Sequence, residues 1–371
     1  MIDSFFRRYS ESYQSYKNGR WCYEDGCFYK GLQDLYLHRR DDWFLEELVR
    51  HVSRRIAPDG TIEGFDPAEY ALDNINAGKV LFLLRDATGD SRYEKALHAL
   101  RAQLRHHPRT ECGNFWHKKA YPRQVWLDGV YMALPFLARY SLEYEDGEAL
   151  ADVLGQVENV RRFMFDPKLG LYYHAYDESR ALAWADPRTG LSRCFWARAI
   201  GWYMMGLVDL CDLLPDPYPD RARYAALLAE VARGVALWQR PDGLWMQVID
   251  QPLREGNYAE SSASAMFSYS FVKGYRLRLL DPSFDDRGQD ARDGIIKRYL
   301  KSNGDGARLG GICLMAGLGA LDGKQGHRDG SFEYYISEPV VENDPKGVGP
   351  LMMLQAELDR RTFASASTAA S

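Results

Sequence analysis

The chain has 371 residues, of which 46% are apolar and 13% aromatic, and this composition excludes an intrinsically disordered protein. It carries 47 Lys and Arg against 52 Asp and Glu, so it lacks the basic excess of a nucleic-acid binder. No apolar stretch approaches the roughly 20 residues that span a bilayer. We therefore expect a globular protein with neither a nucleic-acid nor a membrane partner.

Most of the chain has helical periodicity. In chain order, apolar residues spaced three and four apart predict helices over 125–140, 194–213, 223–238 and 261–280. Turns that contain Gly and Pro separate these segments. Strand-like alternation is confined to 171–174 and 332–336, and we expect 281–300 to be an acidic loop that enters a helix. The pattern predicts an all-α protein.

A helix–turn–helix plan recurs at irregular intervals. Residues 31–44, 78–93 and 206–224 each contain a glycine, an apolar helix end, an acidic turn and an aromatic residue that starts the next helix. The uneven spacing fits a closed toroid of helical hairpins better than a regular solenoid. No Pro-, Gly- or Ser-rich linker divides the chain, so we predict one domain over 1–361 and a flexible Ser/Ala-rich tail over 362–371.

The cysteines and the N-terminal segment bear on the compartment and on cofactors. Six cysteines are scattered without metal-ligand spacing, and the first residues lack the apolar core of a secretory signal, so a cytoplasmic location is expected. Motifs for nucleotide phosphates and for zinc are absent, and GLGALDG (317–323) has the wrong spacing for a dinucleotide loop. We expect neither a cofactor nor a metal.

Tryptophans recur beside carboxylates, amides and histidines near the predicted turns. They are Trp116, Trp126, Trp196, Trp202 and Trp245. An aromatic face beside polar groups suits a sugar, because the ring stacks on C–H groups while the polar side chains bind hydroxyls. Tryptophans also fill the wide centre of a helical toroid, and for any single one the two interpretations are equally supported. The repeated combination favours a sugar site.

Six short segments, in this order, resemble a known family. They are FWHK (115–118), YPRQVWLDGVYMALPF (121–136), HAYD (174–177), FWARAIGWY (195–203), ESSASAMF (260–267) and NDPKGVGP (343–350). The chain resembles the unsaturated glycuronyl hydrolases of glycoside hydrolase family 105, which include the unsaturated rhamnogalacturonyl hydrolases. The resemblance implies an (α/α)6 barrel of six helical hairpins. One departure is Ala199-Ile200, where family members often have Gly-Asn, and it bears on fine specificity.

The resemblance implies a distinctive hydrolysis. The family's substrate is a uronic acid with a C4=C5 double bond, which a polysaccharide lyase leaves at the non-reducing end of its product. An acid protonates C4, water adds at C5, and the hemiketal opens to release the neighbouring sugar, whereas ordinary glycosidases displace at C1. By resemblance, Asp128 is the proton donor and the base for water, and Asp73 is the second carboxylate. The alternative for both residues is a helix cap or a turn.

The same resemblance marks residues that bind the substrate. His117 and His174 match substrate-contact histidines, and Arg198 is a candidate for holding the uronate carboxylate because its guanidinium suits planar anions. The alternatives are structural histidines and an interhelical ion pair. Glu260 is expected to cap a helix and is left out of catalysis. The aromatic residues expected at the sugar site are Tyr23, Trp126, Trp196 and Trp202.

These observations predict a hydrolase that removes a 4,5-unsaturated uronic acid from the non-reducing end of rhamnogalacturonan disaccharides made by a lyase. Its partner is a small oligosaccharide, and neither the leaving sugar nor the oligomeric state can be read from the sequence. Three alternatives stay open. They are an unsaturated glucuronyl or chondroitin disaccharide hydrolase, a sugar epimerase, and a non-catalytic oligosaccharide binder on the same fold.

Overall fold

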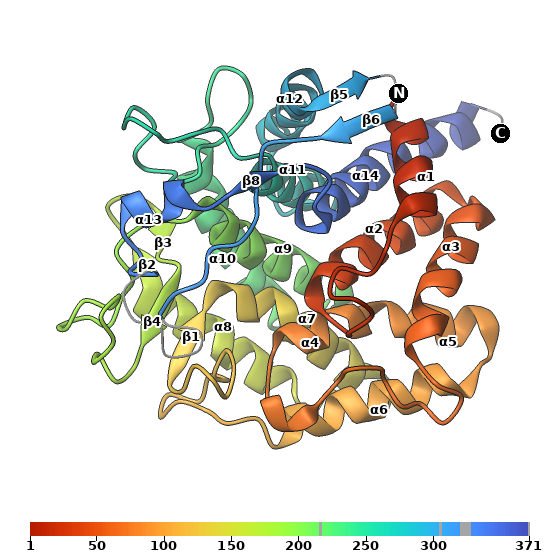
Figure 1. The fold of residues 1–371 in the computed structure, drawn as a ribbon, viewed down its shortest axis with the longest axis horizontal. Coiled ribbons are helices and arrows are strands. Elements are labelled where there is room, and N and C mark those ends of the chain that lie inside the picture. The colour runs from red at the N-terminus through yellow and green to blue at the C-terminus, as the bar shows by residue number, and fades with distance from the viewer. Residues whose placement is uncertain (215–216, 304–305, 320–327, 370–371) are drawn as a thin grey trace.

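The computed structural model describes residues 1–214, 217–303, 306–319 and 328–369, and helices dominate it (Figure 1). The helices form an inner and an outer ring. The inner ring is closed: α2 packs on α4, α4 on α7, α7 on α9, α9 on α11, α11 on α14, and α14 again on α2. The predicted all-α (α/α)6 barrel is confirmed. The inner elements are α2 (Tyr23–Arg39), α4 (Asp73–Asn76) with the 3-10 turn η3 (Ala77–Val80) and α5 (Leu81–Thr88), α7 (Leu127–Tyr144), α9 (Ala197–Leu213), α11 (Ser261–Arg276) and α14 (Pro345–Ala369).

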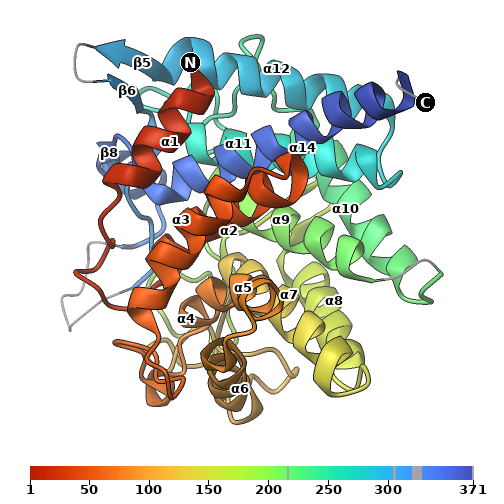
Figure 2. The same ribbon diagram turned by 90° about the vertical axis from the view of Figure 1, so that its right-hand side faces the viewer.

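An outer helix precedes each inner one along the chain, and Figure 2 shows α3, α6, α8, α10 and α12 at the periphery around α2, α7, α9, α11 and α14. The segments 31–44, 78–93 and 206–224 lie at helix–turn–helix connections, as the recurring sequence plan predicts. The outer helices are α1 (Ile2–Ser12), α3 (Asp42–Val52), α6 (Ser91–Arg105), α8 (Leu150–Met164), α10 (Arg221–Ala236) and α12 (Pro282–Tyr299).

The two rings differ in how their side chains are buried. In the inner helix α9, every residue from Ala197 to Cys211 is buried, because neighbouring helices surround it on all sides. In the outer helix α12 the buried residues recur three or four apart, from Phe284 to Ile295, which is the single stripe of a helix that has one face in solvent.

A close approach of the first and last inner helices closes the ring. Gly349 of α14 lies so near α2 that a Cβ atom there would be 2.3 Å from the backbone oxygen of Cys27. Gly31 of α2 faces Met352 of α14 in the same way, at 2.8 Å. Only glycine permits backbones to pack this closely, so these positions fix the distance between α2 and α14.

Short antiparallel two-stranded ladders lie in the connections between helices. Of the two predicted strands, the one in 171–174 is present at its first two residues. The prediction for 332–336 is wrong, because this segment is helical: the Ser331 side chain accepts from Tyr334 N and caps α13 (Phe332–Ser337). The ladders are β1 (Gln124–Trp126) with β4 (Ala175–Asp177), β2 (Phe165–Asp166) with β3 (Leu171–Tyr172), β5 (Leu300–Asn303) with β6 (Gly306–Leu309), and β7 (Ile312–Cys313) with β8 (Val340–Val341).

Two further segments are more helical than the sequence predicts. The prediction of an acidic loop in 281–300 is wrong, because the Asp281 side chain caps α12 and this helix begins at Pro282. α14 continues to Ala369, so the backbone is helical through most of the predicted 362–371 tail. Residues 370–371 and residues 320–323 of GLGALDG lie outside the described part of the chain. Among the described helices, none has the length and apolar character that crossing a membrane requires.

Candidate active site

The N-terminal ends of the inner helices surround a cavity of about 340 Å³, within the range of about 300–1,000 Å³ typical of small-molecule sites. The cavity continues into an outer groove, and Lys17, Tyr23, Asp73 and Lys118 line both spaces. Almost all of the residues predicted from sequence line the cavity. They are Tyr23, Asp73, His117, Trp126, Asp128, Trp196, Arg198 and Trp202, while His174 lies behind this wall.

Asp128 is the second residue of α7 and does not cap it. The N-cap is Trp126, and no side chain caps the helix, so the capping alternative is wrong for Asp128. The Asp128 side chain is 14% exposed, and its Oδ2 is buried without a hydrogen-bond partner among the described residues. Oδ2 therefore faces His174 inside the protein, and the remaining exposed part of the Asp128 side chain lies at the cavity.

The β1–β4 ladder brings His174 beside Asp128. Leu127 N donates to the carbonyl oxygen of His174 at 3.1 Å, next to the last pair of the ladder. His174 Nε2 lies 3.4 Å from Asp128 Oδ2, and the imidazole is fully buried. His174 therefore supports Asp128 from behind, and the structure does not show the predicted contact with substrate.

Asp128 and Tyr335 determine which nitrogen of His174 carries the proton. The Tyr335 hydroxyl lies 2.8 Å from His174 Nδ1. An ionised Asp128 carboxyl group can only accept a hydrogen bond, so the tautomer that suits both neighbours has the imidazole hydrogen on Nε2, facing Asp128, and Nδ1 accepting from the Tyr335 hydroxyl. This tautomer stabilises the carboxylate that forms when Asp128 gives up a proton.

Asp73 is held as a charged carboxylate. Its Oδ2 lies 2.5 Å from Lys118 Nζ, and its Oδ1 lies 3.5 Å from His117 Nε2. Burial alone would raise the pKa of Asp73, but Lys118 and His117 outweigh it and hold the pKa below its usual range. Burial also lowers the pKa of His117 to about 4, so this imidazole is neutral near pH 7. Asp73 lines the same cavity as Asp128.

Aromatic rings form much of the cavity wall. Trp126 stacks on His117 with 4.5 Å between ring centroids and 4° between planes. Tyr23 meets Trp202 edge to face at 6.5 Å. Of the five tryptophans noted in the sequence, Trp126, Trp196 and Trp202 line the cavity. Trp245 is fully buried against phenylalanines of α11 and Trp116 lies outside the lining, so these two support the fold and not the site.

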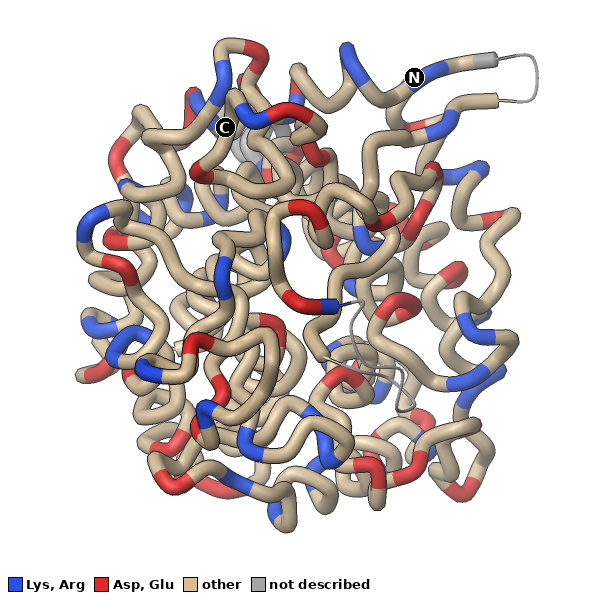
Figure 3. Tube along the Cα trace, turned by 60° about the vertical axis from the view of Figure 1, so that its left-hand side comes forward, with Lys and Arg blue, Asp and Glu red and all other residues tan. Residues whose placement is uncertain are grey.

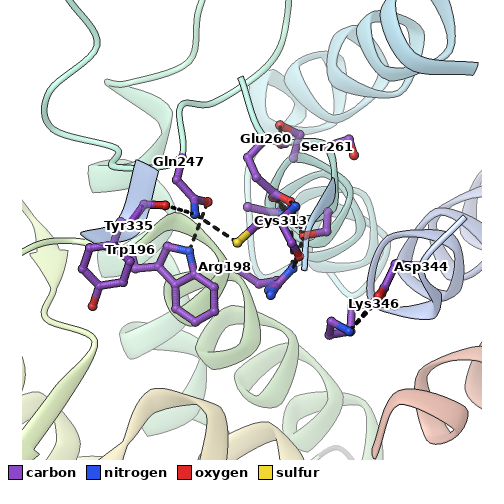
Figure 4. A network of polar contacts seen from close by, with 12 residues as sticks. Trp196, Arg198, Gln247, Glu260, Ser261, Cys313, Tyr335, Asp344 and Lys346 are labelled. Carbon is purple, nitrogen blue, oxygen red and sulfur yellow. Dashed lines mark hydrogen bonds and ion pairs between the residues drawn. The ribbon is translucent and has the colours of Figure 1, made fainter. Parts of the chain in front are cut away.

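Contacts with other parts of the protein hold the Arg198 guanidinium in place (Figure 4). It donates to the carbonyl of Cys313 and, at 3.3 Å, to Ser262 Oγ, while Glu260 lies 4.0 Å away. Its Nε has no hydrogen-bond partner among the described residues. Arg198 thus makes the interhelical contact with Glu260 that one sequence interpretation expected, and it also lines the cavity. Glu260 caps α11 through Ala263 N, as predicted.

A family model described as Glycosyl Hydrolase Family 88 matches residues 1–362. The chain belongs to this family. A glycoside hydrolase from family 105 of C. acetobutylicum has a solved structure that is 40% identical, with a TM-score of 0.87, covering 92% of this chain and 94% of that chain. Protein Atu3128 of Agrobacterium fabrum is 44% identical over 234 residues, which are 61% of this chain and 97% of that protein.

The resemblance to family 105 is confirmed, and the protein is a glycoside hydrolase of the unsaturated glycuronyl hydrolase group. The unsaturated rhamnogalacturonyl hydrolase YesR of Bacillus subtilis is 25% identical over 263 residues, covering 69% of this chain and 72% of YesR. Membership of a hydrolase family decides against the epimerase and against the non-catalytic binder. It leaves the leaving sugar open.

The structure adds residues to this family 88 site that the sequence prediction missed. Lys118 pairs with Asp73, and the signal was present, since it is the last residue of FWHK. Gln247 accepts from Trp196 Nε1 at 3.1 Å and donates to the Tyr335 carbonyl at 3.1 Å, and it lies in the DGLWMQVID block (Figure 4). Tyr16 and Arg328 also line the cavity, but they come from distant segments without a local motif.

Two remaining expectations concern specificity and metals. Ala199 and Ile200 are fully buried in α9 and lie outside the cavity lining, so the departure from Gly-Asn changes helix packing and not the wall of the site. Within the described ranges, no group of three or more His, Cys, Asp and Glu side chains has the arrangement of a metal site.

Proposed function

We propose that this family 88 enzyme removes a 4,5-unsaturated uronic acid from the non-reducing end of rhamnogalacturonan disaccharides made by a lyase. The observation that carries the proposal is the environment of Asp128. Its side chain lines the cavity together with the ion-paired Asp73, and its Oδ2 lies 3.4 Å from the buried His174 Nε2. One carboxyl group is thus available for proton transfer while the other is held as an anion.

The two carboxyl groups have different tasks in the proposed reaction. Asp128 donates a proton to C4 and then, as a carboxylate facing His174 Nε2–H, accepts a proton from the water that adds at C5. The fixed negative charge of Asp73 stabilises the positive charge that develops at C5. The hemiketal at C5 opens and releases the neighbouring sugar.

The walls of the cavity hold the sugar in place for this transfer. Trp126, Trp196 and Trp202 supply aromatic wall for the sugar ring, and the Arg198 guanidinium lines the same cavity and suits the uronate carboxylate. The groove beyond Asp73 and Lys118 then receives the leaving sugar. Similarity to YesR supports rhamnose as that sugar, because YesR is named for rhamnogalacturonyl substrates.

The test is a panel of unsaturated disaccharides with rhamnose, glucosamine or galactosamine as the leaving sugar. Hydrolysis removes the conjugated double bond, so its ultraviolet absorbance disappears. We expect the highest kcat/KM on the rhamnogalacturonan disaccharide. A preference for the chondroitin disaccharide would replace our assignment with the unsaturated glucuronyl alternative.

A second arm tests the role of Asp128. Asp128→Asn should lower kcat by about 10²–10⁴-fold and leave substrate binding nearly unchanged, since the amide keeps the shape and loses the acid. Asp152→Asn is the matched control, because Asp152 pairs with Arg109 on the surface. Equal activity of the two variants would remove the basis of the proposal.

The proposal places this reaction in the cytoplasm. All six cysteines are free, and five of them are buried. Free thiols are usual in reducing compartments, where disulfides are rare. Fractionation of the producing cells with an antibody against the protein would test the location, and recovery in an extracellular fraction would contradict it.

A further inference from the structure

The opposite end of the barrel contains a second cavity, of about 180 Å³. Residues from the C-terminal halves of α2, α9 and α11 line it together with η3, the middle of α7 and Glu357 of α14. An aromatic layer separates it from the active-site cavity. Trp202, on the active-site side, stacks on Tyr131 at 5.0 Å, and Lys79 Nζ lies 3.2 Å from the centre of the Tyr131 ring.

Each carboxylate of this second cavity already has a cationic partner. Asp209 lies 2.7 Å and Asp212 lies 3.0 Å from Lys273 Nζ. Asp34 pairs with Lys30, and Glu357 lies 2.7 Å from Arg276. The negative charges at this end of the barrel are therefore neutralised by ion pairs within the protein.

Lys79 is different from these cations. It is 6% exposed, and its Nζ has neither a hydrogen-bond partner nor a carboxylate within ion-pair distance among the described residues. Gln33 lines the same cavity, is 5% exposed, and leaves its Oε1 without a donor. A buried donor and a buried acceptor are both left unsatisfied around one cavity, although such groups are costly to bury.

The remaining wall of the cavity has the chemistry of a sugar site. Phe82 and Phe136 offer apolar faces, and the ion-paired carboxylates keep free lone pairs that accept from hydroxyl groups. Asp212, which is 34% exposed, and Arg139, which is 29% exposed, mark the side from which solvent reaches the cavity. A compact ligand with one negative charge and several hydroxyl groups satisfies all of these features.

We propose that this second cavity binds a small hydroxy-carboxylate of the sugar-acid class, with its carboxylate on Lys79 Nζ and a hydroxyl donating to Gln33 Oε1. The site is separate from the hydrolytic one and does not depend on the proposed leaving sugar. The ligand supplies a counter-charge to Lys79, whose Nζ contacts the Tyr131 ring and has no ion-pair partner among the residues that the structure describes.

Binding at this site takes up a proton. Burial lowers the pKa of Lys79 to about 7; Asp209 acts against this shift and Lys30 adds to it. At pH 8 the amine is mostly neutral, and an anion beside it favours the ammonium form. The titratable groups near Lys79 on the neighbouring elements include Tyr131, Cys27, Lys30, Asp34 and Asp209.

The experiment is calorimetric titration of the full-length enzyme with D-galacturonate, a saturated sugar acid that lacks the reactive double bond. At pH 8, in Tris and in HEPES, the dependence of the heat on the buffer gives the number of protons taken up. We expect uptake of close to one proton in the wild type and in Asp128→Asn. Lys79→Met should abolish it, and this variant should fold, since it replaces an unpaired buried cation with an apolar chain of similar length.

A second titration, with acetate, tests the role of the ligand's hydroxyl groups. Acetate has the carboxylate without the hydroxyl groups, so we expect it to bind the wild type about tenfold more weakly than D-galacturonate, as the loss of a hydrogen bond predicts. Gln33→Leu should narrow the difference in affinity between the two ligands without affecting proton uptake. Absence of binding at Lys79, proton uptake that survives Lys79→Met, or equal binding of acetate and D-galacturonate by the wild type would overturn the proposal.

Discussion

Asp73 and Asp128 carry the same functional group in two different environments. Asp73 faces a lysine ammonium at 2.5 Å and is fixed as an anion, whereas Asp128 faces a buried imidazole and open cavity. The charge of Asp73 is held by Lys118, a residue adjacent to His117 in the chain.

Lys118→Met tests this division of tasks. Without the ammonium, burial dominates and raises the pKa of Asp73, so a larger fraction of Asp73 is protonated at low pH. We therefore expect the acidic limb of the kcat/KM profile to move to higher pH. The control is Lys119→Met, since Lys119 is exposed and lines only the outer groove. Identical profiles for the two variants would show that Lys118 does not determine the charge of Asp73.

Tyr335→Phe tests the orientation of His174. The variant removes the hydroxyl that donates to Nδ1, so the imidazole is free to move its hydrogen away from Asp128. We expect kcat to fall about tenfold with little change in KM, as for the loss of one hydrogen bond that matters in the transition state. Tyr140→Phe is the matched control, because its hydroxyl lies 2.7 Å from His98 Nδ1, far along α7. Equal kcat values for both variants would contradict a role for Tyr335.

At the scale of elements, local sequence predicted the helices well and the tertiary contacts poorly. Inner helices such as α9 have long apolar runs, so their periodicity and flanking turns locate them to within a few residues. The segment 332–336 was misassigned because alternating apolar residues fit a short strand as well as one helical turn, and only the Ser331 cap distinguishes them. No local signal shows that Tyr335 meets His174, 161 residues earlier in the chain.

Gly349→Ala tests how tightly the inner ring is closed. The new Cβ would be 2.3 Å from the Cys27 carbonyl oxygen, so α14 and α2 must move apart. We expect the free energy of unfolding to fall by about 1–3 kcal/mol, measured by urea denaturation. The control is Gly155→Ala in α8, where a Cβ meets nothing within 4 Å, and it should raise stability by about 0.5–1 kcal/mol. A neutral Gly349→Ala would show that the contact is easily relaxed.

At the scale of the whole molecule, the two ends of the barrel differ in their electrostatics. The inner helices point their N-termini, with the positive ends of their dipoles, toward the active-site cavity, which favours an anionic substrate. Acidic and basic residues are interspersed along the Cα trace and do not gather by sign in one part of the fold (Figure 3). The net charge is −5, so attraction of a uronate depends on Lys17, Lys118, Arg198 and the helix ends and not on the overall field.

The stability of the whole fold should depend on buried neutral histidines. Burial lowers the pKa of His51, His107 and His117 from 6.5 to about 4. Between these pH values the unfolded chain binds more protons than the folded one. The free energy of unfolding therefore falls as the pH drops from 6.5 to about 4, by at most about 1.4 kcal/mol per pH unit for each imidazole.

His107→Gln removes the contribution of one buried histidine to the pH dependence of stability and leaves the lining of the active-site cavity unchanged. His107 Nε2 lies 2.8 Å from the Trp116 carbonyl oxygen, and the Gln amide can still donate to it. Urea denaturation at a series of pH values should give a slope of unfolding free energy against pH that is smaller than in the wild type by close to one proton. An unchanged slope would show that His107 titrates alike in the folded and unfolded chains, and that its burial does not limit stability in acid.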